Sequence, residues 1–350
     1  MAGTVTDPGG RPTAAASRPP RVRTAAAPPG SEFERLTAPY RRELLAHCYR
    51  MLGAPDEAED LVQETYLRAW RSFDGFQGRS SLRVWLYRIA TNACLTALEH
   101  RARRPLPSGL GGPGDDPEAP LAAAPPGVDW VRPLPDTLLA ATPGDPETVV
   151  AARGSVRLAL IAALQHLPAR QRAVLILRDV LAWRTAEVAD LLGTSTAAVK
   201  SLLQRARAEL EAATPREEQF AEPAEPATRA LLDRYMAAFE NADAAALARL
   251  LHADAVLEMP PLPTWFAGRE AVVRFLAATV LGAPGLLRLV PVGANGQPAA
   301  ATYRREADGL HHAHALQVLT TTPGGVCRVV VYLEPGLFAA FGLPGAVGCP

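Results

Sequence analysis

The chain has 350 residues, 48% of them hydrophobic, which is enough for two or three domains that each bury a sizeable core. Its 36 Lys and Arg balance its 36 Asp and Glu, so net charge does not indicate nucleic-acid binding, and no apolar run is long enough to cross a membrane. The four cysteines form no metal-type pairs and the amino terminus lacks a signal-peptide core, so we expect reduced thiols in a cytoplasmic protein.

Residues 1–30 are rich in Pro, Gly, Ala and Thr and contain almost no large apolar side chains. Such a segment cannot bury enough surface to offset the entropy lost on ordering. The composition therefore predicts a disordered tail.

The segment 31–104 has a strongly helical apolar pattern. A first helix is expected over about 34–52. After a break at Gly53, Asp56 caps a second helix, DEAEDLVQETYLRAWRSF. Four of its residues lie off the apolar stripe: Asp60, Gln63, Glu64 and Leu67. The acidic residues near the start of this helix can be explained structurally, because negative charge there is favourable with the helix dipole. The functional alternative is that they form a docking face for a basic partner helix.

A third helix is expected to begin at Ser80 or Ser81, with the sequence SLRVWLYRIATNACLTALEHRARR. Its core stripe contains Leu82, Trp85, Leu86, Ile89, Ala93 and Leu98. Tyr87, Asn92 and the arginines of the C-terminal end lie elsewhere. Cations at a helix C-terminus suit the dipole. Basic residues near exposed aromatic side chains also suit a surface that holds unstacked single-stranded bases.

Residues 105–150 are rich in Pro, Gly and Ala and are too long for a connection within one domain, so we expect a flexible linker. It contains an apolar and aromatic island at Trp130–Leu139. We expect this island to dock either on a partner or on the protein's own domains.

The segment 151–213 is again helical. One helix is expected over 147–165 and a second from Leu167 to near Trp183. The stretch TAEVADLLGTSTAAVKSLLQRARAEL then shows two short helices around a turn at Gly193, which is typical of a helix-turn-helix. The last helix has an apolar stripe of Val199, Leu202, Leu203, Ala206 and Leu210.

The opposite face of that helix carries Lys200, Ser201, Gln204 and Arg205. These side chains can contact base edges and phosphates in a major groove. Arg184 and Thr185, at the start of the preceding helix, can contact phosphate. The alternative is an ordinary helical hairpin with a solvated basic face.

After an acidic linker at 214–226, residues 227–350 change character. Helices are expected over 228–239, 244–251 and 269–281, and strands over 254–259, 299–305, 311–320 and 327–333. Turn signals at Asp308-Gly309 and Pro323-Gly324-Gly325 favour hairpins. Helices followed by an antiparallel sheet indicate an α+β cone.

The cone offers several candidate sites of chemistry. His311, His312 and His314 lack further ligands at metal-binding spacing, so no metal is predicted. Acid–base candidates are His252, Asp254, Glu258 and His314. A candidate pocket for a small ligand contains Met259, Trp265, Phe266 and Tyr303, although these side chains fit a plain core equally well. We predict no catalytic residue and no cofactor.

The string DEAEDLVQETYLRAWRSFDGFQGRSSLRVWLYRIATNACLTALEHRARR closely resembles region 2 of bacterial extracytoplasmic-function sigma factors. In that family the DLVQET segment docks on the clamp helices of the largest subunit of RNA polymerase. The resemblance assigns this role to Asp60, Gln63 and Glu64. The family's next loop and helix hold the melted −10 element. The corresponding residues here are Trp85, Tyr87, Arg88, Asn92, Arg101 and Arg104.

The string LPARQRAVLILRDVLAWRTAEVADLLGTSTAAVKSLLQRARAEL resembles sigma region 4, which binds the −35 element as a duplex and lies near the polymerase flap. The −35 contacts implied are Arg184, Thr185, Lys200, Ser201, Gln204 and Arg205. The strings RYMAAFENADAAALARLLHADAVLEMPP and WFAGREAVVRFL resemble the SnoaL-like fold.

The expected architecture is therefore multidomain. Two all-α domains, sigma region 2 (31–104) and a helix-turn-helix region 4 (151–213), precede an α+β SnoaL-like cone (227–350). The resemblance implies a sigma factor that binds core polymerase and promoter DNA and that its own cone modulates by packing on both helical regions. The alternative is a DNA-tethered small-molecule sensor or enzyme that uses the cone. A polymerase-docking helix argues against that alternative.

Overall fold

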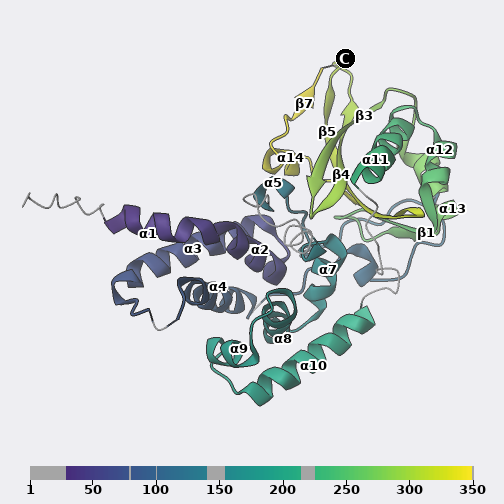
Figure 1. Ribbon diagram of the computed structural model, residues 1–350. Coiled ribbons are helices and arrows are strands. Elements are labelled where there is room, and N and C mark those ends of the chain that lie inside the picture. Colours follow the sequence, from purple (N-terminus) through teal and green to yellow (C-terminus); the bar gives the residue numbers. More distant parts are fainter. Residues whose placement is uncertain (1–28, 79, 100, 140–153, 214–224, 349–350) are drawn as a thin grey trace, which may run out of the picture.

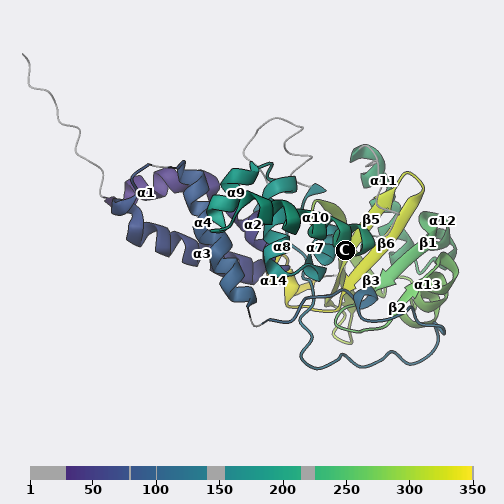
Figure 2. The ribbon, with the colours of Figure 1, turned by 90° about the horizontal axis from the view of Figure 1, so that it is seen from below.

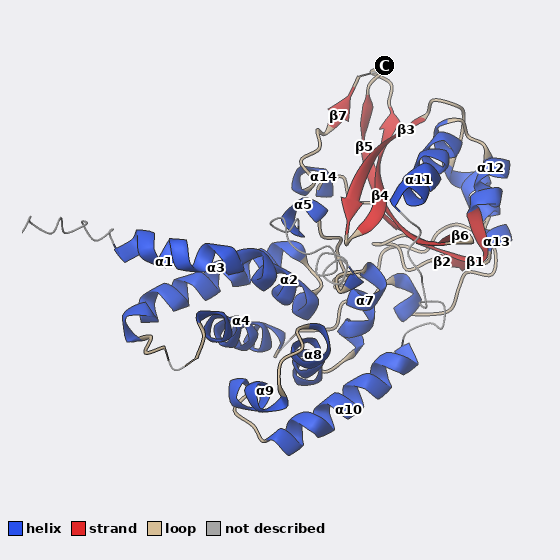
Figure 3. Ribbon diagram, viewed as in Figure 1, coloured by secondary structure: helices blue, strands red, loops and turns tan. Residues whose placement is uncertain are grey.

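The computed structural model describes residues 29–78, 80–99, 101–139, 154–213 and 225–348. Helices make up one half of the molecule, and a sheet with helices packed on it makes up the other (Figures 1 and 3). Within the described ranges, no helix combines the length and apolarity that crossing a membrane requires. Residues 1–28 of the expected tail and residues 214–224 of the acidic linker fall outside these ranges, whereas Pro29 and Gly30 already belong to the first helix.

The first helical block matches the predicted pattern with three changes. Its elements are α1 (Pro29–Thr37), η1 (Ala38–Tyr40), α2 (Arg41–Leu52), α3 (Pro55–Ser72), η2 (Phe73–Gly75) and α4 (Leu82–Leu98). The single helix expected over 34–52 is interrupted at η1, since Pro39 has no N–H to continue the ladder. The helix α3 begins at Pro55 rather than after a cap at Asp56. The third predicted helix, α4, ends at Leu98, so Arg101, Arg103 and Arg104 lie beyond its C-terminus. Ser81 caps α4 as predicted, accepting a hydrogen bond from the Val84 N–H at 3.2 Å.

The second helical block packs directly on the first. It contains α7 (Leu158–His166), α8 (Ala169–Leu175), the π-helical turn η4 (Ile176–Val180), α9 (Thr185–Leu191) and α10 (Thr196–Ala213). The helix expected over 147–165 is confirmed for residues 158–165, but the chain is not helical at 155–157, just before α7 begins. In both views α8 and α9 lie beside α4 (Figures 1 and 2).

The C-terminal domain is one sheet with three helices on one face and a fourth, short helix on the other. The helices are α11 (Glu225–Glu240), α12 (Ala244–Leu250), α13 (Arg269–Phe275), which continues into η6 (Leu276–Val280), and α14 (Leu337–Ala340). The strands are β1 (Leu251–Glu258), β2 (Trp265–Ala267), β3 (Leu287–Ala294), β4 (Gln297–Arg305), β5 (His311–Thr322), β6 (Gly325–Tyr332) and β7 (Ala346–Val347). Their order is β2-β1-β6-β5-β4-β3, with β7 on β5.

Two expectations for this sheet need correction. The strands β1 and β6 pair in parallel, so the sheet is not purely antiparallel. The strand β3 was not predicted, although Asn295-Gly296 between β3 and β4 is a strong hairpin signal. That dipeptide lies in the left-handed region, with φ of 59° at Asn295 and 67° at Gly296.

The apolar island of the linker docks on the protein's own domains. Trp130, Val131 and Leu134 are buried, and the short helix α5 (Asp136–Leu139) follows them. The Arg132 N–H donates to Gly53 O at 2.9 Å, and the Arg132 guanidinium bridges Asp56 and Glu334. The linker is therefore not a free connection at this island, because Trp130, Val131 and Leu134 are part of the buried core.

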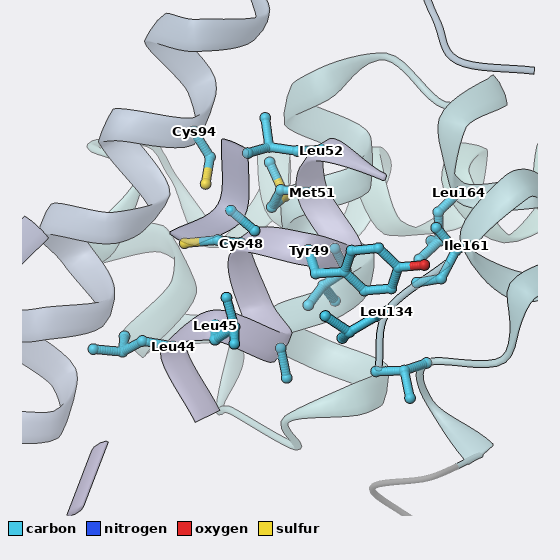
Figure 4. Packing of buried hydrophobic residues seen from close by; sticks show 14 of the residues in the cluster. Leu44, Leu45, Cys48, Tyr49, Met51, Leu52, Cys94, Leu134, Ile161 and Leu164 are labelled. Carbon is cyan, nitrogen blue, oxygen red and sulfur yellow. The ribbon is translucent and has the colours of Figure 1, made fainter. Parts of the chain in front are cut away.

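That core joins all three parts of the chain. Tyr49 of α2, Leu134 of the linker, and Ile161 and Leu164 of α7 pack together (Figure 4). The same cluster includes Tyr303 and other side chains from one face of the sheet. The opposite face of the sheet packs on α11, α12 and α13 as a separate core.

The β3–β4 turn organises this junction. The Asn295 side chain accepts from the Leu134 N–H at 2.9 Å and donates to Tyr49 Oη and Val156 O, both at 2.7 Å. Its backbone N–H donates to Leu134 O at 2.9 Å. One buried amide therefore bonds the first helical block, the linker and the segment leading into α7.

A buried histidine in α2 makes the fold sensitive to acid. His47 is fully buried, with Nε2 2.9 Å from Thr91 Oγ1. Burial, and then the charges of Arg50 and Arg83, lower the pKa of His47 from 6.5 to about 3. The unfolded chain therefore takes up this proton at a higher pH than the folded chain, and stability falls as pH decreases below 6.5.

We expect this group alone to lower the free energy of unfolding by about 1 kcal/mol between pH 6 and pH 5. Urea titrations of the wild type and of His47→Gln at both pH values measure the effect. The variant should lose that part of the pH dependence. Parallel pH dependences in the two proteins would contradict the assignment.

Candidate nucleic-acid interface

The pair α9 and α10 forms the predicted helix-turn-helix. Gly193 has a φ of 61°, so the turn uses the left-handed conformation that glycine permits. Ser195 then accepts from the Ala198 N–H at 3.1 Å and caps α10. Val199 and Ala206 are fully buried, as the apolar stripe predicted.

The polar face of α10 is open to solvent. Lys200, Ser201, Gln204 and Arg205 are all exposed, and within this set Arg205 Nη1 donates to Ser201 Oγ at 3.2 Å. Arg207, on the same helix, is paired with a carboxylate. Its Nε and Nη2 donate to the two carboxylate oxygens of Asp179 at 2.8 and 2.7 Å. The exposed face is therefore available to base edges and phosphates of duplex DNA.

The start of α9 is held by a local ion pair. Both the backbone N–H and the guanidinium of Arg184 donate to Glu187 at 2.8 Å. This pairing lowers the pKa of the Glu187 carboxyl and raises that of the Arg184 guanidinium. Arg184 is otherwise exposed, and Thr185 beside it is partly exposed.

The outer face of α3 carries the predicted docking residues. Asp60 and Gln63 are exposed, and Glu64 is partly exposed with a 2.6 Å contact to Arg68. Leu67 and Trp70, 49% and 55% exposed, belong to the same surface. Sequence reasoning missed Trp70, although its spacing of seven residues from Gln63 places it on that face.

The predicted −10 residues differ in how exposed they are. Trp85 is partly buried against Phe76, with ring centroids 4.9 Å apart, and Asn92 is exposed. Tyr87 was expected to be exposed and is instead fully buried. The ring of Trp183 covers it at 5.3 Å, and burial together with the Glu43 carboxylate raises the pKa of Tyr87. The second helical block therefore hides this side chain.

The predicted −10 arginines are engaged in ion pairs. Arg88 binds Asp190 of α9, which is a direct contact between the two helical blocks. Arg101 and Arg104 both bind Glu57, which lowers the pKa of that carboxyl. Arg104 is 8% exposed, so it is a packed residue rather than a surface cation.

The candidate ligand pocket is not formed. Met259 and Phe266 lie in the core under the helices, whereas Tyr303 lies in the core on the opposite face of the sheet. The indole N–H of Trp265 donates to Gly111 O at 2.9 Å, so the linker covers it. Neighbouring residues of a strand point to opposite faces, which separates the four side chains.

The acid–base candidates do not converge either. Glu258 is buried between Arg328, at 2.6 Å, and the Ser108 N–H, at 2.9 Å. His252 lies 3.9 Å from Asp254 at the surface. His312 is paired with Asp308 rather than with another histidine, and the described residues contain no cluster of three potential metal ligands.

Comparison with known families matches each part of the chain. Residues 36–104 match sigma-70 region 2, residues 157–210 match sigma-70 region 4, and residues 232–333 match the SnoaL-like domain.

Two mycobacterial proteins are similar over most of the chain. The ECF RNA polymerase sigma factor SigG of Mycobacterium tuberculosis is 53% identical over 318 residues, covering 90% of this chain and 85% of SigG. The ECF sigma factor SigJ of the same species is 30% identical, covering 88% of this chain and 92% of SigJ. The crystal structure of SigJ superimposes with a TM-score of 0.58 at 25% identity, over 90% of this chain and all of that one.

Proposed function

This chain belongs to the extracytoplasmic-function family of RNA polymerase sigma factors, and from that membership we propose that it binds bacterial core polymerase and directs it to promoters. The observation that carries the proposal is 53% identity to a sigma factor along 90% of the chain, with both helical blocks in place. We propose that it acts in the cytoplasm, where its polymerase works.

Each open surface has a role in this proposal. Asp60, Gln63 and Glu64 of α3 dock on the clamp helices of the largest subunit, and the exposed Leu67 and Trp70 add apolar contact. The α10 residues Lys200, Ser201, Gln204 and Arg205 read the −35 duplex, with Arg184 and Thr185 on phosphate. The block 157–210 then lies near the polymerase flap.

Binding of the −10 element requires the two helical blocks to rearrange. Trp85, Asn92, Arg101 and Arg104 lie on or near α4, but Tyr87 and Arg88 contact the second helical block. We propose that the described arrangement is a closed state, and that core polymerase separates the two blocks. The free energy for strand opening then comes from binding, because aromatic and basic side chains contact the unstacked bases and their phosphates.

The C-terminal domain acts in this proposal as an internal regulator. Its Asn295 turn bonds both helical blocks and the linker, so it favours the closed state. A catalytic cone is the weaker account, because the acid–base candidates are dispersed and the residues of the candidate pocket lie on opposite faces of the sheet.

Glu64→Arg tests the docking role of α3. We expect affinity for core polymerase to fall by about tenfold or more, because the substitution opposes a basic partner helix. Unfolding should change little, since an exposed ion pair with Arg68 contributes under about 1 kcal/mol. Binding of labelled protein to core polymerase measures the change.

Glu99→Arg is the matched control, because it makes the same charge reversal at the exposed end of α4. It should leave core binding unchanged. Wild-type affinity in Glu64→Arg would overturn the docking assignment. Run-off transcription that never depends on this protein would overturn the proposed function itself.

A further inference from the structure

A basic cleft lies where the two helical blocks meet. It has a volume of about 260 Å³ and is bounded by the end of α4 on one side and by α7 and α8 on the other. Among the described residues that line it, the ionisable side chains are Glu57, Arg101, Arg103, Arg104, His166 and Arg172. Four guanidinium groups therefore share one lining carboxylate.

Arg172 forms the least compensated part of the cleft. It is 4% exposed, and its acceptors are all neutral: Met51 O, Gln165 Oε1 at 2.6 Å, Gln165 O at 3.2 Å and Leu167 O at 3.1 Å. Its Nε is buried and has no acceptor in the described structure. A buried charge without a counter-charge is costly, and an anion nearby would offset that cost.

The rest of the cleft does not supply that anion. Glu57 is divided between Arg101 and Arg104, and Asp129, 3.5 Å from Arg104, is 73% exposed at the rim. Arg103 meets only neutral acceptors, His166 Nδ1 at 3.0 Å and Gly109 O at 3.3 Å. Burial, and then the positive charges of Arg103 and Arg172, lower the pKa of His166. Four positive charges thus face two negative ones.

We infer that this cleft binds a small polyvalent anion that carries phosphate groups, close in size to pyrophosphate or to the diphosphate of a nucleotide. Guanidinium groups match phosphate oxygens in pairs, and charge-assisted bonds of this kind are about twice as strong as neutral ones. The volume admits such an anion and excludes a DNA duplex.

The position of the cleft gives the anion a regulatory effect. Glu57 lies in α3, and Arg101–Arg104 come directly after α4, so these residues belong to the first helical block. His166 and Arg172 belong to the second. A ligand that contacts both blocks binds the closed arrangement better than the separated one, so it stabilises the closed arrangement. This inference concerns the isolated chain. The cleft shares Arg101 and Arg104 with the proposed −10 contacts, whereas Arg103, His166 and Arg172 have no part in them.

Calorimetric titration of the full-length chain with inorganic pyrophosphate tests the site. We expect one pyrophosphate per chain and a loss of about tenfold or more in affinity in Arg103→Ala. Arg103 is exposed and bonds neutral acceptors, so this variant should fold. Arg71→Ala is the control, because Arg71 is an exposed arginine on α3 away from the cleft.

Two further experiments complete the test: thermal unfolding with pyrophosphate, and binding of a single-stranded oligonucleotide. Pyrophosphate should raise the melting temperature of the wild type and of Arg71→Ala, and raise that of Arg103→Ala much less. Absence of binding at millimolar pyrophosphate, or equal weakening by Arg71→Ala, would overturn the inference. Binding of a single-stranded oligonucleotide alone, weakened by Arg103→Ala, would also overturn it and assign the cleft to a nucleic-acid backbone.

Discussion

Asn295→Ala is expected to lower the free energy of unfolding by about 2–4 kcal/mol, because it leaves buried partners of the amide without hydrogen bonds. The wild-type side chain bonds Leu134, Tyr49 and Val156 at 2.7–2.9 Å. Val156 O and the Leu134 N–H lose these partners in the variant. Urea unfolding followed by tryptophan fluorescence measures the loss, and hydrogen exchange should increase at the Leu134 amide.

Two further variants separate the causes. Asn295→Gly also removes the amide but tolerates the positive φ of 59°, so the difference between the Gly and Ala variants reports backbone strain. Asn241→Ala removes an exposed asparagine of the same domain and should change stability by less than about 0.5 kcal/mol. If Asn295→Gly were as stable as the wild type, the Asn295 amide would not be holding the junction together.

The double variant Lys200→Ala/Arg205→Ala is expected to weaken promoter binding by roughly 30-fold or more. Each side chain in a base or phosphate contact contributes about 1–3 kcal/mol, and both are exposed on the polar face of α10. The measurement is binding of reconstituted holoenzyme to a promoter fragment located by transcript mapping. The salt dependence of binding should also become shallower.

Arg207→Ala provides the matched control on the same helix. Its guanidinium is already bound to Asp179, so its removal should weaken promoter binding by less than about threefold. If the control lost as much promoter affinity as the double variant, α10 would act through its overall positive charge rather than through contacts of Lys200 and Arg205. Wild-type binding by the double variant would remove α10 from the −35 contact.

The periodicity of the sequence predicted the helices and their faces well. The apolar stripe of α10 is buried and its polar face is exposed, because a repeat of 3.6 residues is a local property of the chain. The outer face of α3 is likewise where its pattern placed it. The same kind of reasoning located β4, β5 and β6 but overlooked β3, whose signal was the Asn-Gly turn that follows it.

The exposure of candidate site residues was predicted correctly where one element alone decides it. Lys200 and Gln63 are exposed because no other segment among the described residues covers them. Tyr87 was placed wrongly because Trp183, 96 positions later, packs over it. The pocket residues Met259 and Tyr303 were grouped by sequence, but the sheet places them on opposite faces.

The sequence by itself determined the family, the two helical blocks, the α+β domain and the faces of α3 and α10, since these follow from motifs and from patterns within single elements. Only the tertiary structure decided that the linker island is buried, that Arg88 binds Asp190, and that Asn295 bonds three parts of the chain. These contacts join residues 102 to 246 positions apart. Such pairs leave no local period, so the free energy of packing the folded chain selects them.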